Sequence, residues 1–427
     1  MKTLLFVVVT LMSVALSAHQ ACAQLIISEF RLQGPNGAND EFIEIYNNSG
    51  ADHTVAASDA SAGYALVASD GQVRGTIPNG TVIPNRGHYL IVNSVGYSLA
   101  SYPAGNGTTA TGDATYTSDI PLNAGIALFN TANPANFTLA NPMDAVGSTT
   151  EANTLYKEGA GYPGLSTQGN IANVDHSLVR RLPGGCTGSA GSGDCTTVAL
   201  IETTPDAADG APQDTNNNAV DFIFVDTNGT AAGAGQRLGA PGPENLSSPI
   251  QRNGSLTITP IDSTQCATCP PNLVRDQTPD GANNSLYGTL DIRRKITNNT
   301  GANVTRLRFR VVDITTFPSI GGVADLRPRT STAAVVTVSN SGYFGSGTGT
   351  TNITVQGTTL EQPPSQPNGG GYNSTLSAGT ITLATPLAPT DDPGTPTVLE
   401  NVINVRFLLG LQQKGTFRFA VNVEVLP

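Results

Sequence analysis

From Leu25 onward, short runs of apolar or alternating apolar and polar residues are separated by clusters of Gly, Pro, Asn and Asp. Runs of about five to seven residues with a period of two are typical of half-buried β-strands, and such clusters are typical of turns. No convincing helical period competes with this pattern. The chain is therefore predicted to be all-β. In its first half the predicted strands are 25–31, 41–46, 63–67, 89–93, 126–130, 177–181 and 221–225.

A break in the strand pattern predicts a domain boundary at residues 238–245, where turn-forming Gly and Pro accumulate. We expect a signal peptide over 1–23, a first domain over 24–247 with long loop insertions, and a second domain over 251–427. About eight strands in the second domain suit a two-sheet β-sandwich. These strands are 255–260, 285–296, 303–314, 333–338, 353–358, 380–384, 398–408 and 416–425.

Composition narrows the class of protein. The 427 residues include 47 Gly and 28 Pro, and only 12% are charged, against about a quarter in an average protein. The formal net charge of −11 disfavours nucleic acid as a partner, because phosphate binding needs clustered Lys and Arg.

The first residues have the three parts of a secretory signal peptide. A positive start at Lys2 is followed by an apolar run from Leu4 to Ala18 and then by Ala21-Cys22-Ala23, a small-x-small cleavage site. The run is shorter than the roughly 20 apolar residues that span a bilayer. We therefore expect a secreted protein, extracellular or periplasmic, with no membrane span after cleavage. Alternatives are a single membrane anchor or a lipoprotein modified at Cys22.

Four further cysteines remain, at positions 186, 195, 266 and 269. In an oxidising compartment they predict two disulfides, and proximity favours Cys186 with Cys195 and Cys266 with Cys269. A redox dithiol at the second pair is disfavoured because Pro270-Pro271 opposes the helix that such a site needs. A zinc site built from all four cysteines is the other alternative.

Spaced segments of the first domain resemble the lamin-tail domain, an immunoglobulin-like β-sandwich that also occurs in exported bacterial proteins. One departure is Tyr64, which stands where the family usually has Trp, and the long loops make this domain larger than is typical. The second domain resembles no family that we recognise. The matching segments are 26–30, 40–47, 62–66, 81–92, 177–181, 214–222 and 239–242.

The resemblance implies an immunoglobulin-like fold and a role as an interaction module. Bacterial lamin-tail domains are sometimes attached to hydrolase domains, but we recognise no such domain here. Chromatin association, known for the eukaryotic lamins, is not carried over, because this chain is acidic and is expected to be exported.

Glu29 and Glu44 lie in the middle of two strands that are expected to be neighbours. Paired carboxylates can act as acid and base in glycosidases. We favour a structural role, in which both residues cap loop amides or pair with an arginine such as Arg180 or Arg181.

Asp214, Asn216 and Asn218 offer oxygen atoms at alternate positions, as a calcium loop does. Ala219 replaces the Gly that an EF-hand needs, and Val225 replaces its closing Glu, so an EF-hand is excluded. A looser calcium site is one interpretation, and a turn built from Asx residues is the favoured one.

Arg306, Arg308 and Arg310 alternate with apolar residues, so one face of this predicted strand is cationic. With Arg293 and Arg294 nearby, this face could bind an anionic glycan or an acidic partner. The favoured alternative is a solvated face whose arginines pair with acidic residues on neighbouring strands.

The motifs of zinc hydrolases, serine hydrolases and nucleotide-binding proteins are missing from the sequence. We therefore expect a non-catalytic protein without a cofactor that binds a protein or a glycan at the cell envelope. The alternatives are a carbohydrate-active or calcium-assisted hydrolase that uses the acidic residues of the first domain, and a structural matrix protein that self-associates.

Overall fold

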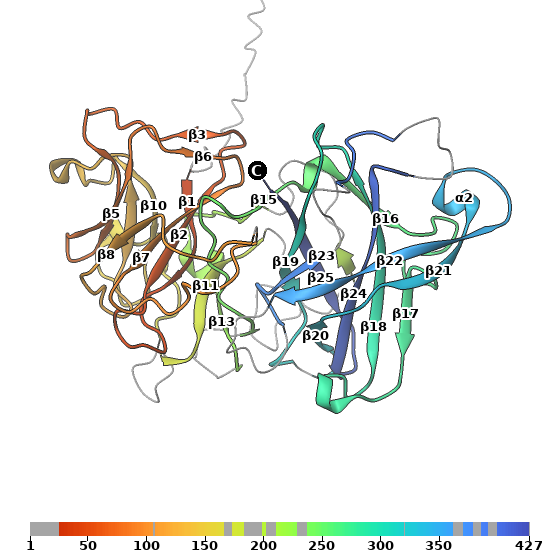
Figure 1. Ribbon diagram of the computed structural model, residues 1–427. Coiled ribbons are helices and arrows are strands. Elements are labelled where there is room, and N and C mark those ends of the chain that lie inside the picture. Colours follow the sequence, from red (N-terminus) through yellow and green to blue (C-terminus); the bar gives the residue numbers. More distant parts are fainter. Residues whose placement is uncertain are drawn as a thin grey trace, which may run out of the picture.

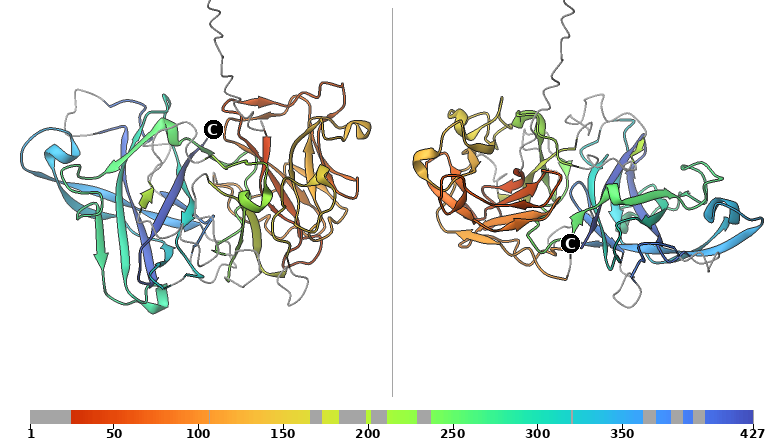
Figure 2. Two further views of the ribbon diagram at one scale, coloured as in Figure 1. Left: turned by 180° about the vertical axis from the view of Figure 1, so that it is seen from behind. Right: turned by 90° about the horizontal axis from the view of Figure 1, so that it is seen from above.

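A computed structural model gives the structure of the chain (Figure 1). It describes residues 25–105, 107–165, 173–182, 199–201, 211–228, 237–319, 321–361, 370–378, 386–391 and 399–426. The protein is all-β, as predicted, and its strands form two domains that lie side by side (Figures 1 and 2). The predicted signal peptide lies outside the described residues.

The first domain contains two sheets and a short strand pair. The pair is β3 (His53–Thr54) with β6 (Val82–Ile83), and the short helices are η1 (Pro134–Asn136), η2 (Thr154–Tyr156) and α1 (Asn218–Asp221). The four-stranded sheet has the order β10 (Pro142–Val146), β9 (Ile126–Phe129), β4 (Gly63–Ala68) and β5 (Val73–Pro78). The seven-stranded sheet has the order β14 (Arg237–Leu238), β13 (Phe222–Asp226), β11 (His176–Arg180), β1 (Leu25–Arg31), β2 (Phe42–Asn47), β7 (His88–Asn93) and β8 (Ala114–Tyr116).

The core of the first domain lies between its two sheets. Ile43 and Ile45 of β2 point inward and pack in one cluster with Leu66 of β4 and Leu128 of β9. Because side chains alternate along a strand, Glu44 points to the outer face of the seven-stranded sheet.

A β-bulge in β1 determines where Glu29 points. The pairing of β1 with β2 shifts register between Ile27 and Glu29. Ile27 and Phe30 both pack in the inner core, whereas alternation without the bulge would put them on opposite faces. The extra residue, Ser28, thus leaves Glu29 on the outer face, directly opposite Glu44 on β2.

The second domain is built on a 12-stranded sheet that folds over on itself. Phe309 of β19 packs edge to face on Phe407 of β24, with 5.0 Å between the ring centroids, so the two halves of the sheet enclose one core. The short helices here are η5 (Asn253–Ser255), η6 (Gly281–Asn283) and α2 (Asn340–Tyr343). The main strand order is β12 (Ala199–Ile201), β25 (Arg418–Val425), β19 (Leu307–Ile314), β23 (Thr375–Ala378), β22 (Thr350–Glu361), β24 (Val402–Gln413), β18 (Thr289–Asn298) and β16 (Leu256–Pro260). Further strands are β15 (Ile250–Gln251) on β25, β17 (Leu273–Asp276) on β18, β20 (Asp325–Arg329) on β24 and β21 (Ala334–Ser339) on β22.

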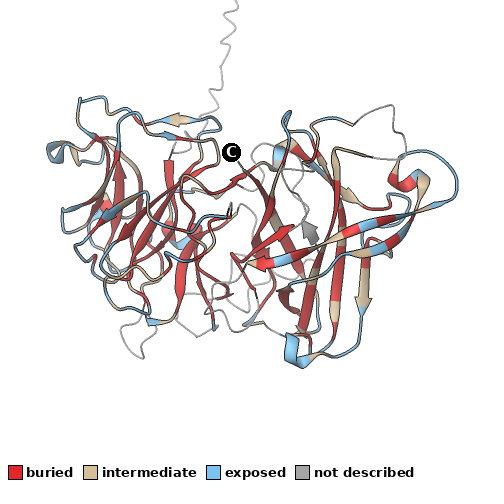
Figure 3. Cartoon of the chain, viewed as in Figure 1, coloured by how far each residue is buried: buried red, intermediate tan, exposed pale blue. Residues whose placement is uncertain are grey.

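The two domains share buried surface. Val179 of β11 and Val225 of β13 belong to the hydrophobic cluster of the second domain. Strand β12, which precedes the predicted boundary, pairs in parallel with β25 of the second domain. Buried residues line both sides of the contact between the domains (Figure 3).

Most predicted strands are present, with ends shifted by a few residues. The shorter strands were missed, among them β5, β8, β10, β17 and β20, and the predicted strand 380–384 lies outside the described residues. No helix in the described part of the chain has the length and hydropathy needed to cross a membrane.

Candidate functional site

The candidate site lies where the outer face of the seven-stranded sheet meets the second domain. The first domain contributes Glu29 from β1, Glu44 from β2 and His88 from the start of β7. All three are buried, and Glu29 and Glu44 are direct cross-strand partners. The predicted pairing of these two strands is therefore confirmed.

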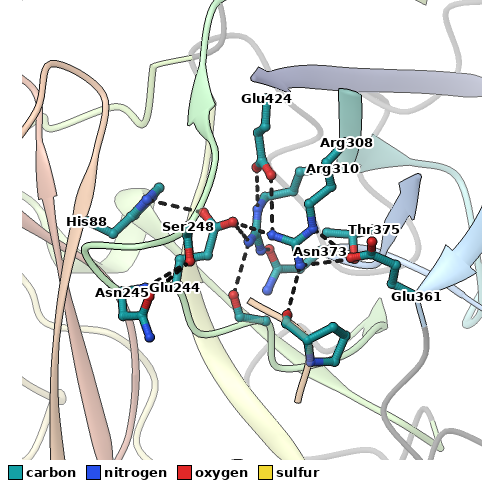
Figure 4. A network of polar contacts seen from close by, with 12 residues as sticks. His88, Glu244, Asn245, Ser248, Arg308, Arg310, Glu361, Asn373, Thr375 and Glu424 are labelled. Atoms are coloured by element: carbon teal, nitrogen blue, oxygen red, sulfur yellow. Dashed lines mark hydrogen bonds and ion pairs between the residues drawn. The ribbon is translucent and has the colours of Figure 1, made fainter. Parts of the chain in front are cut away.

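The second domain contributes Arg308 and Arg310 from β19 and Glu424 from β25 (Figure 4). Arg310 forms ion pairs of 3.0 Å with Glu424 and 2.9 Å with Glu244. Arg308 pairs with the same two glutamates, at 3.3 Å for Glu424, and with Glu361 of β22 at 2.8 Å. The two arginines are thus enclosed by carboxylates from both sheet halves and from the segment between the domains.

Glu244 is the central residue of this network, and it belongs to the segment that was predicted as a domain boundary. It is fully buried. Its Oε1 pairs with both arginines, while its Oε2 lies 3.2 Å from Nδ1 of His88. Glu244 therefore links the first domain to the second.

The two paired glutamates of the first domain cap loop amides, as predicted. Glu29 accepts hydrogen bonds from the backbone N–H of Gly242 at 2.9 Å and from Asn373 Nδ2 at 3.0 Å. Glu44 accepts them from the hydroxyl of Ser28 and from the backbone N–H of Glu244, at 2.6 and 2.7 Å. The predicted partner Arg180 pairs instead with Asp144, Asp214 and Asp221. The arginine whose charge acts on Glu29 is Arg310.

Burial changes the acid–base properties of these groups. It raises the pKa of Glu44 well above its ordinary value, and the nearby carboxylates of Glu29 and Glu244 raise it further. Burial and Glu244 raise the pKa of Glu424 to about 7, in opposition to the two arginines. Burial also lowers the pKa of His88 to about 3, so that its imidazole is neutral at neutral pH.

The network borders a cavity of about 60 Å³. Glu29, Glu44, His88, Glu244 and Glu424 all line it. Cavities that bind drug-sized molecules usually measure about 300–1,000 Å³, whereas a single water needs about 10–15 Å³. The space beside the paired carboxylates therefore fits a few waters or an ion.

A second group of carboxylates surrounds Arg180 on β11. Arg180 pairs with Asp144 at 2.7 Å, Asp214 at 3.3 Å and Asp221 at 3.4 Å. Asp144 also accepts the backbone N–H of Ile27, which flanks the bulge in β1. This group therefore holds the irregular part of β1 in place.

Glu158 joins this second group. One of its carboxylate oxygens, one of Asp144 and one of Asp214 lie within 4.8 Å of one another. Burial, Asp144 and Asp214 raise the pKa of Glu158 to about 9, which indicates that it is protonated at neutral pH.

The predicted calcium ligands do not converge. Asn218 is buried, and its side chain bonds the backbone of Gly147, Glu158 and Ala145. Asn216 is exposed and has a left-handed backbone with φ of 54°. The turn predicted here is built on Asp214, whose Oδ1 accepts the backbone N–H of Asn216 at 3.3 Å, and Asp214 also gathers with Asp144 and Glu158.

The predicted cationic face is not open to an external anion. Arg308 and Arg310 are 2% and 9% exposed and are paired with glutamates, while Arg306, at the edge, pairs with Glu361 at 3.1 Å. The expectation of a ligand-binding or solvated face is therefore wrong at Arg308 and Arg310, because the first domain covers this side of β19. The expected pairing with an acidic residue on a neighbouring strand is present, at Glu424 of β25.

The other two predicted binding residues lie elsewhere, on β18. Arg293 pairs with Asp291 at 2.7 Å, and Arg294 is buried and donates to the backbone carbonyl of Asn272 at 3.1 Å. Neither belongs to the network around Glu244.

One predicted disulfide is confirmed, between Cys266 and Cys269. It lies in the loop between β16 and β17, where Asn272 Nδ2 donates to the carbonyl of Cys266. Cys186 and Cys195 lie outside the described residues.

The sequence analysis missed His88, Glu244, Glu424, Asp144 and Glu158 as members of these groups. Only Glu424 carried a local signal, since it is an acidic residue within an alternating strand. Glu244 follows Gly and Pro in a segment that looked like a linker, and no local pattern indicates its partners.

No protein-family model matches the chain, and comparisons with curated proteins and with solved structures gave no significant match. The resemblance of the first domain to the lamin-tail domain therefore rests on its sequence segments alone.

Proposed function

We propose that this chain is an exported, non-catalytic interaction protein whose partner adds a β-strand to the edge of β21. The observation that carries the proposal is the ribbon formed by β21 and β22. In the part of the chain that the structure describes, β21 pairs with β22 alone. Its other edge can therefore offer backbone N–H and C=O groups to an extended strand.

The ribbon lacks the features that usually protect such an edge. Residues 330–360 contain no charged residue and no Pro, whereas natural edge strands are commonly blocked by Lys, Pro or inward-pointing charges. Val335 on β21 is 73% exposed. β-branched residues in an uncharged strand favour pairing with another strand.

The other face of the ribbon is anchored. Val336 and Val338 pack in a cluster with Ile353 and Val355 of β22 and with Tyr343 of α2. The edge is thus presented on a fixed support, which lowers the entropy lost when a partner strand binds.

The paired carboxylates support the non-catalytic part of the proposal. Glu29 and Glu44 are engaged with loop amides at the domain interface, beside a cavity too small for a sugar ring. A larger hollow of about 310 Å³ lies on the second domain, and its described lining residues include Arg275, Lys414 and Phe417 but no Asp, Glu, His or Cys. Neither space combines room for a glycan with a carboxylate pair.

A second candidate function is a self-assembling structural protein. The uncharged ribbon is complementary to itself, because two β21 strands can pair antiparallel about a two-fold axis without bringing like charges together. Such pairing would give a dimer whose population rises with concentration.

The test uses a labelled peptide with the sequence of residues 333–339 as the probe strand. Fluorescence anisotropy should show binding to the wild-type chain and loss of binding in Val335→Lys, which places a charge on the edge strand. Val95→Lys is the matched control, since Val95 is 64% exposed but lies outside the ribbon. Sedimentation of the same three proteins distinguishes self-association from binding of a foreign strand.

Two results would overturn the proposal. One is a wild-type chain that binds no probe peptide and stays monomeric at all concentrations. The other is hydrolysis of a polysaccharide by the wild type that Glu29→Gln or Glu44→Gln abolishes.

A further inference from the structure

Two buried polar atoms in the network face each other without a hydrogen bond. Nδ1 of His88 and Oε2 of Glu244 are both shielded from solvent, and neither has a hydrogen-bond partner. They lie 3.2 Å apart, in residues that are 7% and 0% exposed. Buried polar atoms without partners are rare and call for an explanation.

The charges around these atoms do not balance. Three arginines (Arg306, Arg308 and Arg310) face five glutamates (Glu29, Glu44, Glu244, Glu361 and Glu424). If every group keeps its formal charge, the interface holds two negative charges in excess, and buried charges are costly unless they are paired or bind a metal. Protonation of buried glutamates such as Glu44 would remove the excess, and so would one divalent cation.

The residues that could bind such a cation are already close together. One ligand atom from each of Glu44, His88 and Glu244 lies within 4.8 Å of the other two. Zinc ligands at about 2.0–2.2 Å from the ion lie roughly 3–3.5 Å from one another, which matches the His88–Glu244 separation of 3.2 Å. Glu44 lies nearest to the other ring nitrogen, with its Oε1 3.8 Å from Nε2 of His88, so its carboxylate has to turn toward Nδ1 to complete the set.

We propose that Glu44, His88 and Glu244 bind one divalent transition-metal ion, with Zn²⁺ as the best match, between the two domains. An imidazole nitrogen with two carboxylates suits zinc and its neighbours better than calcium or magnesium, which prefer oxygen ligands alone. The adjoining cavity leaves room for a water as the fourth ligand.

Further groups would orient these ligands. Oε1 of Glu244 is held by Arg308 and Arg310, which leaves Oε2 for the ion. Glu44 is oriented by the hydroxyl of Ser28 at 2.6 Å. Hydrogen bonds of this kind to metal ligands commonly change affinity by about 10–100-fold.

The experiment is titration of the metal-stripped full-length chain with zinc chloride, followed by isothermal calorimetry. We expect one ion per chain, with an affinity lowered by about tenfold or more in Glu244→Gln and in His88→Ala. Glu158→Gln is the matched control, because it removes a carboxylate from the other acidic group and should leave zinc affinity unchanged.

Cobalt binding gives a readout that needs no variant. Co²⁺ in a site of low coordination number with a nitrogen ligand should give intense visible absorption that zinc displaces. The proposal is overturned if the wild-type chain binds neither ion stoichiometrically. His88 and Glu244 would then only contact each other, without a metal ion between them. It is also overturned if Glu158→Gln, rather than Glu244→Gln, removes binding.

Discussion

At the scale of single residues, polar side chains in this protein hold irregular backbone in place. Asp113, just before β8, accepts the backbone N–H groups of Leu90 and Leu246 on one oxygen, at 2.8 and 3.1 Å. It thereby ties β7 to the segment between the domains. Asn218 does the same for the loops around β10.

Asp113→Asn should remove one component of the pH dependence of stability. Desolvation by the surrounding protein raises the pKa of Asp113 from 3.8 to about 6, although the residue is exposed, so the folded state holds this proton more tightly than the unfolded state. Its stabilising contribution is therefore complete below about pH 4 and is lost as the pH rises through 6. The Asn variant keeps an oxygen acceptor but does not titrate.

Denaturant unfolding at several pH values checks this prediction. The variant should match the wild type at pH 4 and be more stable at pH 7.5 by less than about 1 kcal/mol, because Asp113 is exposed and solvent screens its charge. An equal difference at both pH values would contradict it.

Asn218→Ala should lower stability by about 2–4 kcal/mol, because two N–H groups and one carbonyl lose their partner. The loss should be the same in calcium and in a chelator, since the side-chain oxygen and nitrogen of Asn218 both bond backbone groups. Asn216→Gly, at an exposed position with positive φ, is the control and should change little. A calcium-dependent loss in thermal unfolding would restore the original calcium prediction.

At the scale of elements, the bulge in β1 affects a contact between the domains, whereas the disulfide in the loop before β17 affects only that loop. The bulge turns Glu29 toward the second domain. The disulfide between Cys266 and Cys269 only closes a short loop, beside which Asn272 bonds the backbone.

The double variant Cys266→Ser/Cys269→Ser should therefore lose no more than about 2 kcal/mol, the chain entropy of so short a loop. It should still unfold in one transition and keep zinc binding. Denaturant unfolding measures the loss, and a loss of the whole second domain would show that the bridge has a wider role.

At the scale of the whole molecule, the two domains are joined by a buried ion network and a shared apolar cluster. Arg310 contacts Glu424, Glu244, Asn373 and the carbonyl of Gly242. Its partners come from the second domain and from the segment between the domains. These partners in turn contact the first domain, since Gly242 and Asn373 bond Glu29 and Glu244 lies beside His88. The network therefore couples the domains rather than stabilising one of them.

Arg310→Ala should destabilise the protein by about 3–5 kcal/mol, because it leaves buried carboxylates unpaired. Calorimetry should show one unfolding transition in the wild type and separate transitions for the two domains in the variant. Arg329→Ala is the control, since Arg329 pairs with the half-exposed Asp280, and should change stability by less than about 1 kcal/mol. An Arg310→Ala protein that unfolds like the wild type would rule out the coupling.

The sequence by itself determined most of the longer strands and, apart from the bulge in β1, the side of these strands that is apolar. Alternation is a local property, so β1, β7 and β25 could be located from their own residues, and Glu29 and Glu44 could be placed on neighbouring strands. The Cys266–Cys269 disulfide could also be predicted, because the two cysteines are only three positions apart in the sequence.

Only the tertiary structure decided what covers the polar face of each strand. Alternation puts Arg308 and Arg310 opposite Phe309, but it cannot say whether water or another domain lies on that side. The first domain lies there. The two arginines are therefore buried and paired with glutamates at the domain interface, although their alternating pattern is typical of an exposed face. For the same reason Glu244, His88 and Glu424, far apart in sequence, meet only because the two domains pack face to face.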